Sequence, residues 1–302
     1  MGGVFHKLRH PRRCYVVCTI PRSGSNLLTD GLRDTRRAGM PKQFFLPKAK
    51  SRYAEELGID PAVDYAAYVC AIVNTRVTRN EVFGFKLMSW YLDDFLARLR
   101  EAHGFGNSTT SDLELLRSAF PRLRFLRIVR RHKLRQALST ARALQTGLWK
   151  VQKGKSILRE PEFDPDLIEQ SLHEAERQEK IWDDFFRQIK IKPFEVEYEK
   201  LCQDYERTIR AVLNFLRITL PAGARVGPPA TTRQADEVSL PAQESQAVRF
   251  LGQQPTVWSE PRLRGCRRTR LDRPMHLIAL VIVILPHLAA NPIAANEDVL
   301  RR

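Results

Sequence analysis

The sequence predicts an α/β protein in which helices flank a mostly parallel central sheet, and two observations support this fold class. Short apolar stretches rich in β-branched residues alternate with longer segments of helical period between residues 14 and 217. Such alternation is typical of parallel strands joined by helices that cover both faces of a sheet. Ligands in these sheets bind beyond the carboxyl ends of the strands, so the loops after the strands are the candidate site.

Each element is assigned from its own apolar period. Strands are expected at residues 14–20, 82–87, 123–129 and 194–199. Helices are expected at residues 26–37, 61–79, 91–100, 113–119, 134–145, 165–189 and 204–216. Gly39 and Pro41 end the first helix, and residues 42–50 are expected to form a loop.

The character of the chain changes after Pro221, where Pro, Ala, Gln and Arg dominate and no period holds. We therefore expect an α/β domain over residues 1–237 and a basic, irregular tail over residues 238–302. The tail contains an uninterrupted apolar run at 277–285. A straight helix needs about 20 apolar residues to span a bilayer. This length disfavours a membrane anchor and leaves contact between the tail and a membrane open.

The formal charge of the 302-residue chain is +16, which favours an anionic partner such as phosphate, sulfate, nucleic acid or a membrane surface. Aromatic and basic residues are not interleaved as in proteins that bind single strands, so we expect no nucleic acid partner. The first thirteen residues lack the apolar run of a secretory signal.

Cysteine usage points to a reducing, cytoplasmic location and away from a metal site. The five cysteines have no CxxC spacing, which argues against zinc, and we expect no metal. They are Cys14, Cys18, Cys70, Cys202 and Cys266. The first two lie on an expected buried strand, where they would point to the same face as small hydrophobic residues.

The stretch TIPRSGSNLL, residues 19–28, joins the first expected strand to the first expected helix. A strand that turns sharply into a helix points backbone N–H groups outward, and the helix dipole adds partial positive charge there. Gly24 allows close approach of a ligand to the backbone, and Ser23 and Ser25 supply hydroxyl donors. Arg22 brings a full charge, and Asn26 either caps the helix or donates to the ligand.

This loop lacks the Gly-Lys-Ser/Thr of nucleoside triphosphatases, which disfavours a P-loop kinase. Its residues suit a compact anion, such as a phosphosulfate, that binds without Mg²⁺. A strand–helix turn with a purely structural role is the alternative interpretation.

Several motifs, in their order and spacing, resemble the mycobacterial trehalose 2-sulfotransferase family. They are PRSGSNLL, AGMPKQFF, FGFKLM, RIVRRHKLRQALSTARALQTGLW, YEKL and TRQAD. The resemblance covers residues 14 to about 237. It implies a P-loop-like α/β fold, 3′-phosphoadenosine 5′-phosphosulfate as the donor, and transfer of a sulfuryl group to a carbohydrate or glycolipid hydroxyl. A homodimer is left open.

On this resemblance, two segments hold the donor nucleotide. The loop after the first strand would hold the 5′-phosphosulfate, through Arg22, Ser23, Gly24 and Ser25, with Asn26 beside them. The basic turn after the third strand would hold the 3′-phosphate. Arg130 matches best there, Ser139 is a second candidate, and Arg135 and Gln136 are further candidates. An Arg at the end of a buried strand also suits bidentate phosphate recognition, and a solvated basic face is the alternative.

Lys86 ends the apolar stretch VFGFKLM of the second expected strand. Its side chain either extends from the sheet to solvent or reaches into the site. We favour the site, where the cation could neutralise charge on the bridging oxygen as the donor's bond breaks.

Gln43 departs from the family pattern. In the sulfotransferases that this chain resembles, a Glu precedes the two aromatics of PKQFF and is the catalytic base, whereas the neutral amide of Gln43 cannot accept a proton. Met40 replaces another acidic residue, and Arg36 replaces a Gly. The residues that the resemblance assigns to the acceptor are therefore altered, while those that it assigns to the donor nucleotide are kept.

Three explanations for Gln43 compete. The acceptor could already be ionised or acidic, or another group could serve as the base. The candidates for that base are Glu55, Glu56, Asp64, His103 and His132. In the third explanation the chain is a nucleotide-binding protein of the same fold with lost or weak catalysis, which is the alternative to an active sulfotransferase.

Overall fold

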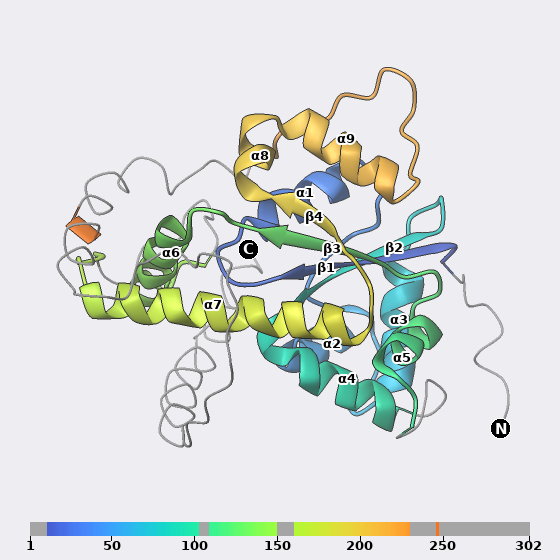
Figure 1. Cartoon of the computed structure of the whole chain (residues 1–302). Helices are drawn as coiled ribbons and strands as arrows, with labels where there is room; N and C mark the ends of the chain where they lie inside the picture. Colours follow the sequence, from blue (N-terminus) through green and yellow to red (C-terminus); the bar gives the residue numbers. More distant parts are fainter. Residues whose placement is uncertain (1–10, 103–108, 150–159, 230–245, 248–302) are drawn as a thin grey trace, which may run out of the picture.

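The computed structural model describes residues 11–102, 109–149, 160–229 and 246–247. Four strands in these ranges form one parallel sheet in the order β2-β1-β3-β4 (Figure 1). They are β1 (Arg13–Thr19), β2 (Val82–Met88), β3 (Arg124–Val129) and β4 (Phe194–Glu197). The predicted fold class is confirmed, including the strand–loop–helix unit of a P-loop-like fold at β1 and the helix that follows it.

Helices cover both faces of the sheet (Figure 1). One face carries α1 (Ser25–Asp34), α8 (Tyr198–Gln203) and α9 (Tyr205–Phe215). The other carries α2 (Lys50–Glu56), α3 (Tyr65–Arg76), α4 (Leu92–Glu101), α5 (Asp112–Ala119) and α7 (Pro165–Gln188). Short 3-10 turns, η1 (Pro47–Ala49) and η2 (Ser89–Tyr91), precede α2 and α4.

Alternate residues of β1 enter two separate apolar cores. Tyr15 and Val17 pack with α1, α8 and α9, whereas Cys14, Val16 and Cys18 pack with the helices of the opposite face. The expectation that the two cysteines share a face is thereby confirmed. Because β1 is buried on both faces and paired on both edges, its carboxyl end is held rigidly, and the loop that follows inherits this position.

The last expected strand, 194–199, is too long by two residues. It ends at Glu197, and Tyr198 begins α8. The alternation of residues could not mark this end, because Glu continues to alternate with an apolar or aromatic residue through residue 199, as it would in a strand. The helical start of α8 instead brings the Glu199 carboxylate to the backbone N–H groups of Arg131 and His132, at 3.1 and 3.0 Å.

The helix expected at residues 61–79 is shorter, as α3 (Tyr65–Arg76), and two other boundaries differ from expectation for identifiable reasons. The first helix ends at Asp34 rather than at residue 37, because Arg36 has a left-handed backbone with φ 54° that a helix cannot include. The expected loop at 42–50 contains η1 and the first residue of α2. The buried side chains of Ala49 and Tyr53 draw this segment onto the core.

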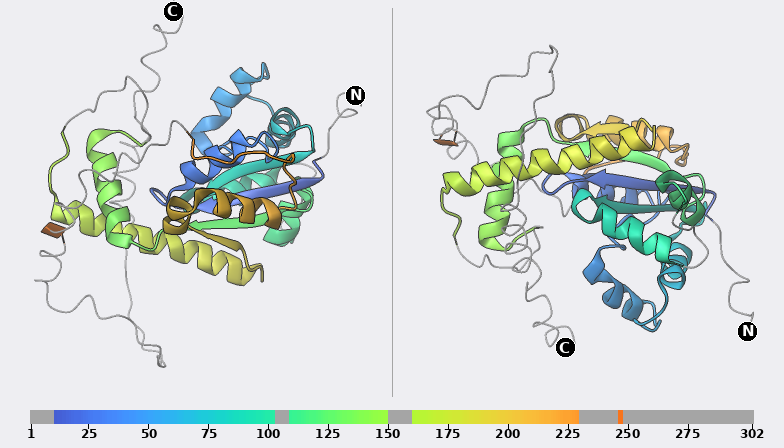
Figure 2. Two further views of the ribbon diagram at one scale, coloured as in Figure 1. Left: turned by 90° about the horizontal axis from the view of Figure 1, so that it is seen from above. Right: turned by 60° about the horizontal axis from the view of Figure 1, so that its bottom comes forward.

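The helix α6 (Lys133–Thr146) lies beyond the carboxyl ends of the strands, alongside the first part of α7 (Figures 1 and 2). The two helices share a small apolar cluster of their own, which includes Leu138, Ile168 and Leu172. Ala247, which is 1% exposed, also packs into this cluster. The division at residue 237 stays a prediction, and the apolar run at 277–285 lies outside the described residues.

Candidate functional site

The loop between β1 and α1 turns through two residues of positive φ, Arg22 at 57° and Gly24 at 87°. Gly24 is the N-cap of α1, and in the described chain no side chain caps this helix. The first turn of α1 also lacks an acidic residue. The N–H groups of a first turn have no partner within their own helix, and the helix dipole makes them attractive to an anion.

The hydroxyl of Ser23 turns away from the surface of this loop. Its Oγ lies 2.6 Å from Oγ1 of Thr19, which itself donates to the carbonyl of Ile20, and Ser23 is fully buried. The expectation that this hydroxyl donates to a ligand therefore does not match the geometry. Ser23 can offer an anion its backbone N–H, while its hydroxyl ties the loop to the end of β1.

Asn26 does not cap α1, because it lies within the first turn and the N-cap is Gly24. Its Oδ1 instead accepts a hydrogen bond from Nζ of Lys86, at 2.7 Å. Lys86 is only 6% exposed, so its ammonium is directed to the β1–α1 loop rather than to solvent. This bond joins the end of β2 to the start of α1 and places a buried cation beside the loop.

Arg22, Arg130 and Ser139 converge at the other side of the loop, although they come from three different segments. Nε of Arg22 donates to Oγ of Ser139 at 2.7 Å, and Nη1 of Arg22 donates to the carbonyl of Trp149 at 2.8 Å. Nη1 of Arg130 donates to the carbonyl of Arg22 at 3.2 Å. The guanidinium of Arg22 thus lies against α6, with the residues assigned to the 3′-phosphate.

Gln136 has a structural contact in the same place. Its Nε2 donates to the carbonyl of Pro21 at 2.7 Å, and its side chain is buried. The carbonyls of Pro21 and Arg22 therefore both face α6 and the turn before it. Arg135, the other further candidate, is exposed on α6.

Tyr198 was not singled out by sequence reasoning, although it belongs to the YEKL motif. Its ring covers the guanidinium of Arg130, with 4.7 Å between the guanidinium carbon and the ring centroid. The same ring occupies the space beside Gly24, where an added Cβ would lie 2.1 Å from Cδ2 of Tyr198. The strand register could have identified Tyr198. Val129 pairs with Glu197, so Arg130 and Tyr198 follow paired residues at the ends of neighbouring strands.

Trp182 of α7 is a second residue that the sequence did not single out. Its Nε1 donates to the carbonyl of Thr19 at 2.9 Å, and its ring is buried in the core of that face. The last carbonyl of β1 therefore has a hydrogen-bond donor from α7. Only the packing of α7 under the sheet reveals this contact.

Gln43 lies near Lys86 at the carboxyl end of β2. The backbone N–H of Lys86 donates to the carbonyl of Lys42 at 2.9 Å, so this segment runs along the end of the strand. The hydroxyl of Tyr91, which donates to the carbonyl of Lys86 at 3.3 Å, lies beside the side chain of Gln43. Burial raises the pKa of Tyr91 far above its ordinary value, so neither the amide nor the phenol can take up a proton.

The aromatic pair after Gln43 anchors its position. Phe44 and Phe45 are buried among the rings of the large core, and the hydroxyl of Tyr68 donates to the carbonyl of Phe44 at 2.6 Å. Gln43 is therefore held by the backbone on both of its sides. Arg36, which stands where the family pattern has a Gly, has a φ of 54°, a backbone conformation that favours Gly.

The candidates for a relocated base have other partners or lie apart. Glu56 pairs with Arg76 at 2.5 Å, and Asp64 caps α3 by accepting from the N–H of Ala66 at 2.9 Å. Glu55 is exposed on α2, and His132 precedes α6. His103 lies outside the described residues. The structure thus supplies no reason to move the role of base to Glu56 or Asp64.

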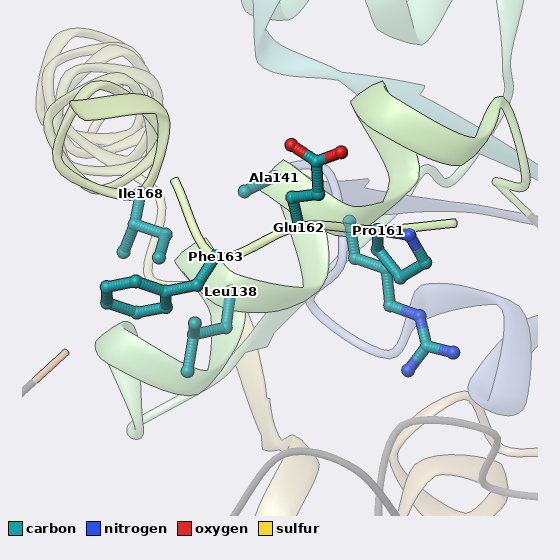
Figure 3. Close-up of a pocket in the computed structure, with 7 residues that line it drawn as sticks. Leu138, Ala141, Pro161, Glu162, Phe163 and Ile168 are labelled. Atoms are coloured by element: carbon teal, nitrogen blue, oxygen red, sulfur yellow. The ribbon is translucent and has the colours of Figure 1, made fainter. Parts of the chain in front are cut away.

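Two surface pockets lie away from these residues. Figure 3 shows the first, between α6 and the segment before α7, where Leu138, Phe163 and Ile168 face one another. The second lies between α7 and β4 and includes Arg127, Phe186 and Lys192. Neither is lined by a residue predicted for the site. The candidate site is therefore defined by its polar contacts at the carboxyl edge of the sheet.

Within the described ranges, the structure has no group of three or more His, Cys, Asp or Glu side chains that could hold a metal ion. The same part of the chain has no helix long and apolar enough to cross a membrane.

Comparison with known proteins identifies relatives over most of the chain. The sequence model of the Stf0 sulphotransferase family matches residues 14–244. Trehalose 2-sulfotransferase of Mycolicibacterium smegmatis is 26% identical over 257 residues, which cover 76% of this chain and 92% of the relative. Trehalose 2-sulfotransferase of Mycobacterium tuberculosis is 27% identical over 234 residues, which cover 68% and 84%.

Solved structures with detectable similarity are more distant. A sulfotransferase domain from the olefin synthase of Synechococcus PCC 7002 has a TM-score of 0.43 and 16% identity, covering 85% of this chain and 98% of that one. A sulfotransferase from Alicyclobacillus acidocaldarius has a TM-score of 0.43 and 15% identity, covering 80% and 92%.

Proposed function

This chain belongs to the Stf0 sulphotransferase family, and from that premise we propose that it transfers a sulfuryl group from 3′-phosphoadenosine 5′-phosphosulfate to a sugar hydroxyl. The observation that carries the proposal is the meeting of Arg22, Arg130 and Ser139 beside the uncapped start of α1. Cationic side chains and outward N–H groups at one sheet edge suit a ligand with two separate anionic groups.

The proposed roles follow the two sides of the loop. The backbone N–H groups of Ser23, Gly24 and Ser25, with Asn26 beside them, would receive the 5′-phosphosulfate. Arg130, Ser139 and the guanidinium of Arg22 would receive the 3′-phosphate. The position of Arg130 directly after the buried strand β3, with a side chain that is 5% exposed, supports its role, because a guanidinium held in place suits bidentate recognition of a phosphate.

The donor supplies an activated sulfuryl group, whose bond to the bridging phosphate oxygen breaks as a bond forms to the acceptor oxygen. Lys86 is the proposed catalytic cation, because its ammonium lies at the start of α1, beside the loop proposed for the phosphosulfate. There it stabilises the negative charge that develops on the leaving oxygen. The acceptor hydroxyl must also lose its proton to a base.

The acceptor is proposed to be a carbohydrate or glycolipid hydroxyl, on the strength of the trehalose 2-sulfotransferases that the chain resembles. Catalytic competence is part of the proposal. One observation favours the alternative, a nucleotide-binding protein with lost or weak catalysis: Gln43 is a neutral amide, and burial raises the pKa of the neighbouring Tyr91, which therefore stays neutral. Cys14, Cys18 and Cys70 are thiols, which supports the proposed cytoplasmic location.

Calorimetric titration with 3′,5′-adenosine bisphosphate tests the donor site. Arg22→Ala and Arg130→Ala should each weaken binding by about 1.5–3 kcal/mol, the range for hydrogen bonds to charged groups. Arg131→Ala is the matched control, because the guanidinium of Arg131 pairs with Glu195 and Glu197 instead. Unchanged affinity in both test variants would place the nucleotide elsewhere.

Sulfate transfer over a panel of trehalose, hexoses and glycolipids separates the enzyme from the binding protein. An active enzyme transfers sulfate to at least one acceptor at saturating donor. The binding protein retains affinity for the bisphosphate and modifies none of them. ATP added in place of the bisphosphate should fail to raise the melting temperature, since the loop lacks the Lys of triphosphate sites.

A further inference from the structure

The YEKL motif, residues 198–201, begins α8 beside the end of β3 (Figure 1). We propose that Tyr198 is a positioning residue that orients Arg130 and thereby sets the preference for nucleotides that carry a 3′-phosphate. This inference rests on the function proposed above. It assigns to the first residue of the motif a role in donor selectivity.

The stacking geometry is the first support. The guanidinium carbon of Arg130 lies 4.7 Å from the centroid of the Tyr198 ring, within the range of cation–π attraction. A guanidinium held by its face can still donate through its edges in the plane of the group. Planar, edge-on donation is how Arg binds two oxygens of one phosphate, so the ring preserves the useful geometry.

Contact with Gly24 is the second support. The same ring fills the space beside Gly24, so it touches both the loop after β1 and the residue after β3. Gly24 has a φ of 87°, and an added Cβ there would overlap the ring. The ring therefore sets the separation between the two groups proposed to hold the 5′ and 3′ ends of the donor.

The neighbour of Tyr198 restrains the same turn through the backbone. The carboxylate of Glu199 accepts from the N–H of Arg131 at 3.1 Å and from the N–H of His132 at 3.0 Å. The two residues after Arg130 are thus held by the residue after Tyr198. Arg130 has both its side chain and the chain that follows it fixed from the start of α8.

Titration with 3′,5′-adenosine bisphosphate and with adenosine 5′-monophosphate measures the preference for the 3′-phosphate directly. In Tyr198→Leu the ratio of the two affinities should fall about tenfold, within the strength of a buried cation–π contact. Tyr198→Phe keeps the ring, and its ratio should stay within about threefold of wild type. A preference that is retained in Tyr198→Phe would show that the face of the ring, and not the hydroxyl, orients Arg130.

Tyr205→Leu is the matched control, because Tyr205 also fills the space beside a glycine of α1. An added Cβ at Gly31 would lie 1.8 Å from the Tyr205 hydroxyl, yet this ring is not the one that covers Arg130. Its loss should lower the melting temperature without changing the affinity ratio. If Tyr198→Leu does not fold, Tyr198→Met replaces it, since a flexible Met adapts to the same space.

Each outcome separates this inference from the proposed function. A wild type that binds neither nucleotide overturns both. A wild type that prefers the bisphosphate, with an unchanged preference in Tyr198→Leu or Tyr198→Met, overturns only the role of Tyr198. An equal loss of preference in Tyr205→Leu also overturns it, because the effect would then reflect general loosening of α1.

Discussion

Gln43 combines a well-held position with an unsuitable functional group. Phe44 and Phe45 anchor it, the carbonyl of Lys42 accepts from the N–H of Lys86, and its side chain lies beside Tyr91. At the residue scale, the position at which the resemblance implies a base therefore lies near the proposed catalytic cation. The side chain at that place cannot take a proton.

Gln43→Glu should raise the rate of sulfate transfer to trehalose or a hexose. The carboxylate has almost the size of the amide, so it fits the same position without repacking. General-base assistance is worth about 10²–10⁴-fold. Because Met40 and Arg36 also differ from the family pattern, a rise of about tenfold, or ~1.4 kcal/mol of barrier, counts as support. The rates are measured at saturating donor.

The control for this change is Gln43→Ala, which removes the amide without adding a base and should not increase the rate. The Gln43→Glu variant should also lose rate as pH falls through the pKa of the new carboxylate. Equal rates in wild type and Gln43→Glu, with donor affinity intact and the wild type already fast, would show that the base lies elsewhere.

The turn between β3 and α6 depends on an acidic residue from another element. No side chain caps α6 in the described chain, yet the N–H groups of Arg131 and His132 are satisfied by Glu199. Burial alone would raise the pKa of Glu199. The hydrogen bonds from His132 and Arg131 outweigh it, so the pKa of this carboxyl is lowered. At the element scale, α8 thus stabilises the start of α6.

Glu199→Gln should lower the melting temperature at neutral pH, by an amount equivalent to about 1 kcal/mol, because the amide has one neutral acceptor oxygen where both carboxylate oxygens of Glu199 accept. A carboxyl whose pKa is depressed on folding stabilises the fold above its unfolded pKa, about 4.3. That contribution is lost as pH falls through the folded pKa. Melting curves from pH 7 to pH 3 should therefore show the two proteins converging in acid.

Glu206→Gln is the matched control for this experiment. Glu206 forms an exposed pair with Arg210 four residues on, a type worth about 0.3–0.5 kcal/mol. Its removal should have a smaller effect at neutral pH. A constant difference between wild type and Glu199→Gln at every pH would argue against a role for the Glu199 charge.

Two apolar cores hold the molecule together, one on each face of the sheet, and among the described residues Val226 is the last that either contains. The cluster between α6 and α7 is separate and includes Ala247. At the scale of the whole molecule, the sheet and the candidate site rest on the two large cores. Beyond residue 237 the structure describes residues 246 and 247, of which Ala247 packs into the α6–α7 cluster.

A chain truncated after Asp236 should fold cooperatively and bind 3′,5′-adenosine bisphosphate, because every described residue of both large cores precedes the truncation. A small fall in melting temperature is expected from the loss of Ala247. Calorimetry and titration make the comparison, with a chain truncated after Ala247 as the matched control. If the shorter chain is insoluble or lacks a cooperative transition, the tail belongs to the core.

The sequence by itself determined the parallel α/β fold and the location of the candidate site. Both depend on local pattern: apolar runs specify the strands, and a loop that follows a buried strand must lie at its carboxyl end. Arg22, Lys86, Arg130 and Ser139 could be chosen on that basis and by resemblance. They do converge around one loop.

Only the tertiary structure decided which atoms of the site face one another. In the folded chain the Ser23 hydroxyl bonds to Thr19, Asn26 accepts from Lys86, and Arg22 donates to Ser139. The contacts of Tyr198 and Trp182 join residues from different strands and helices, and pattern along the chain carries no information on such pairs. Side-chain direction depends on packing and on strand register, which are fixed when the sheet and its two helical layers assemble.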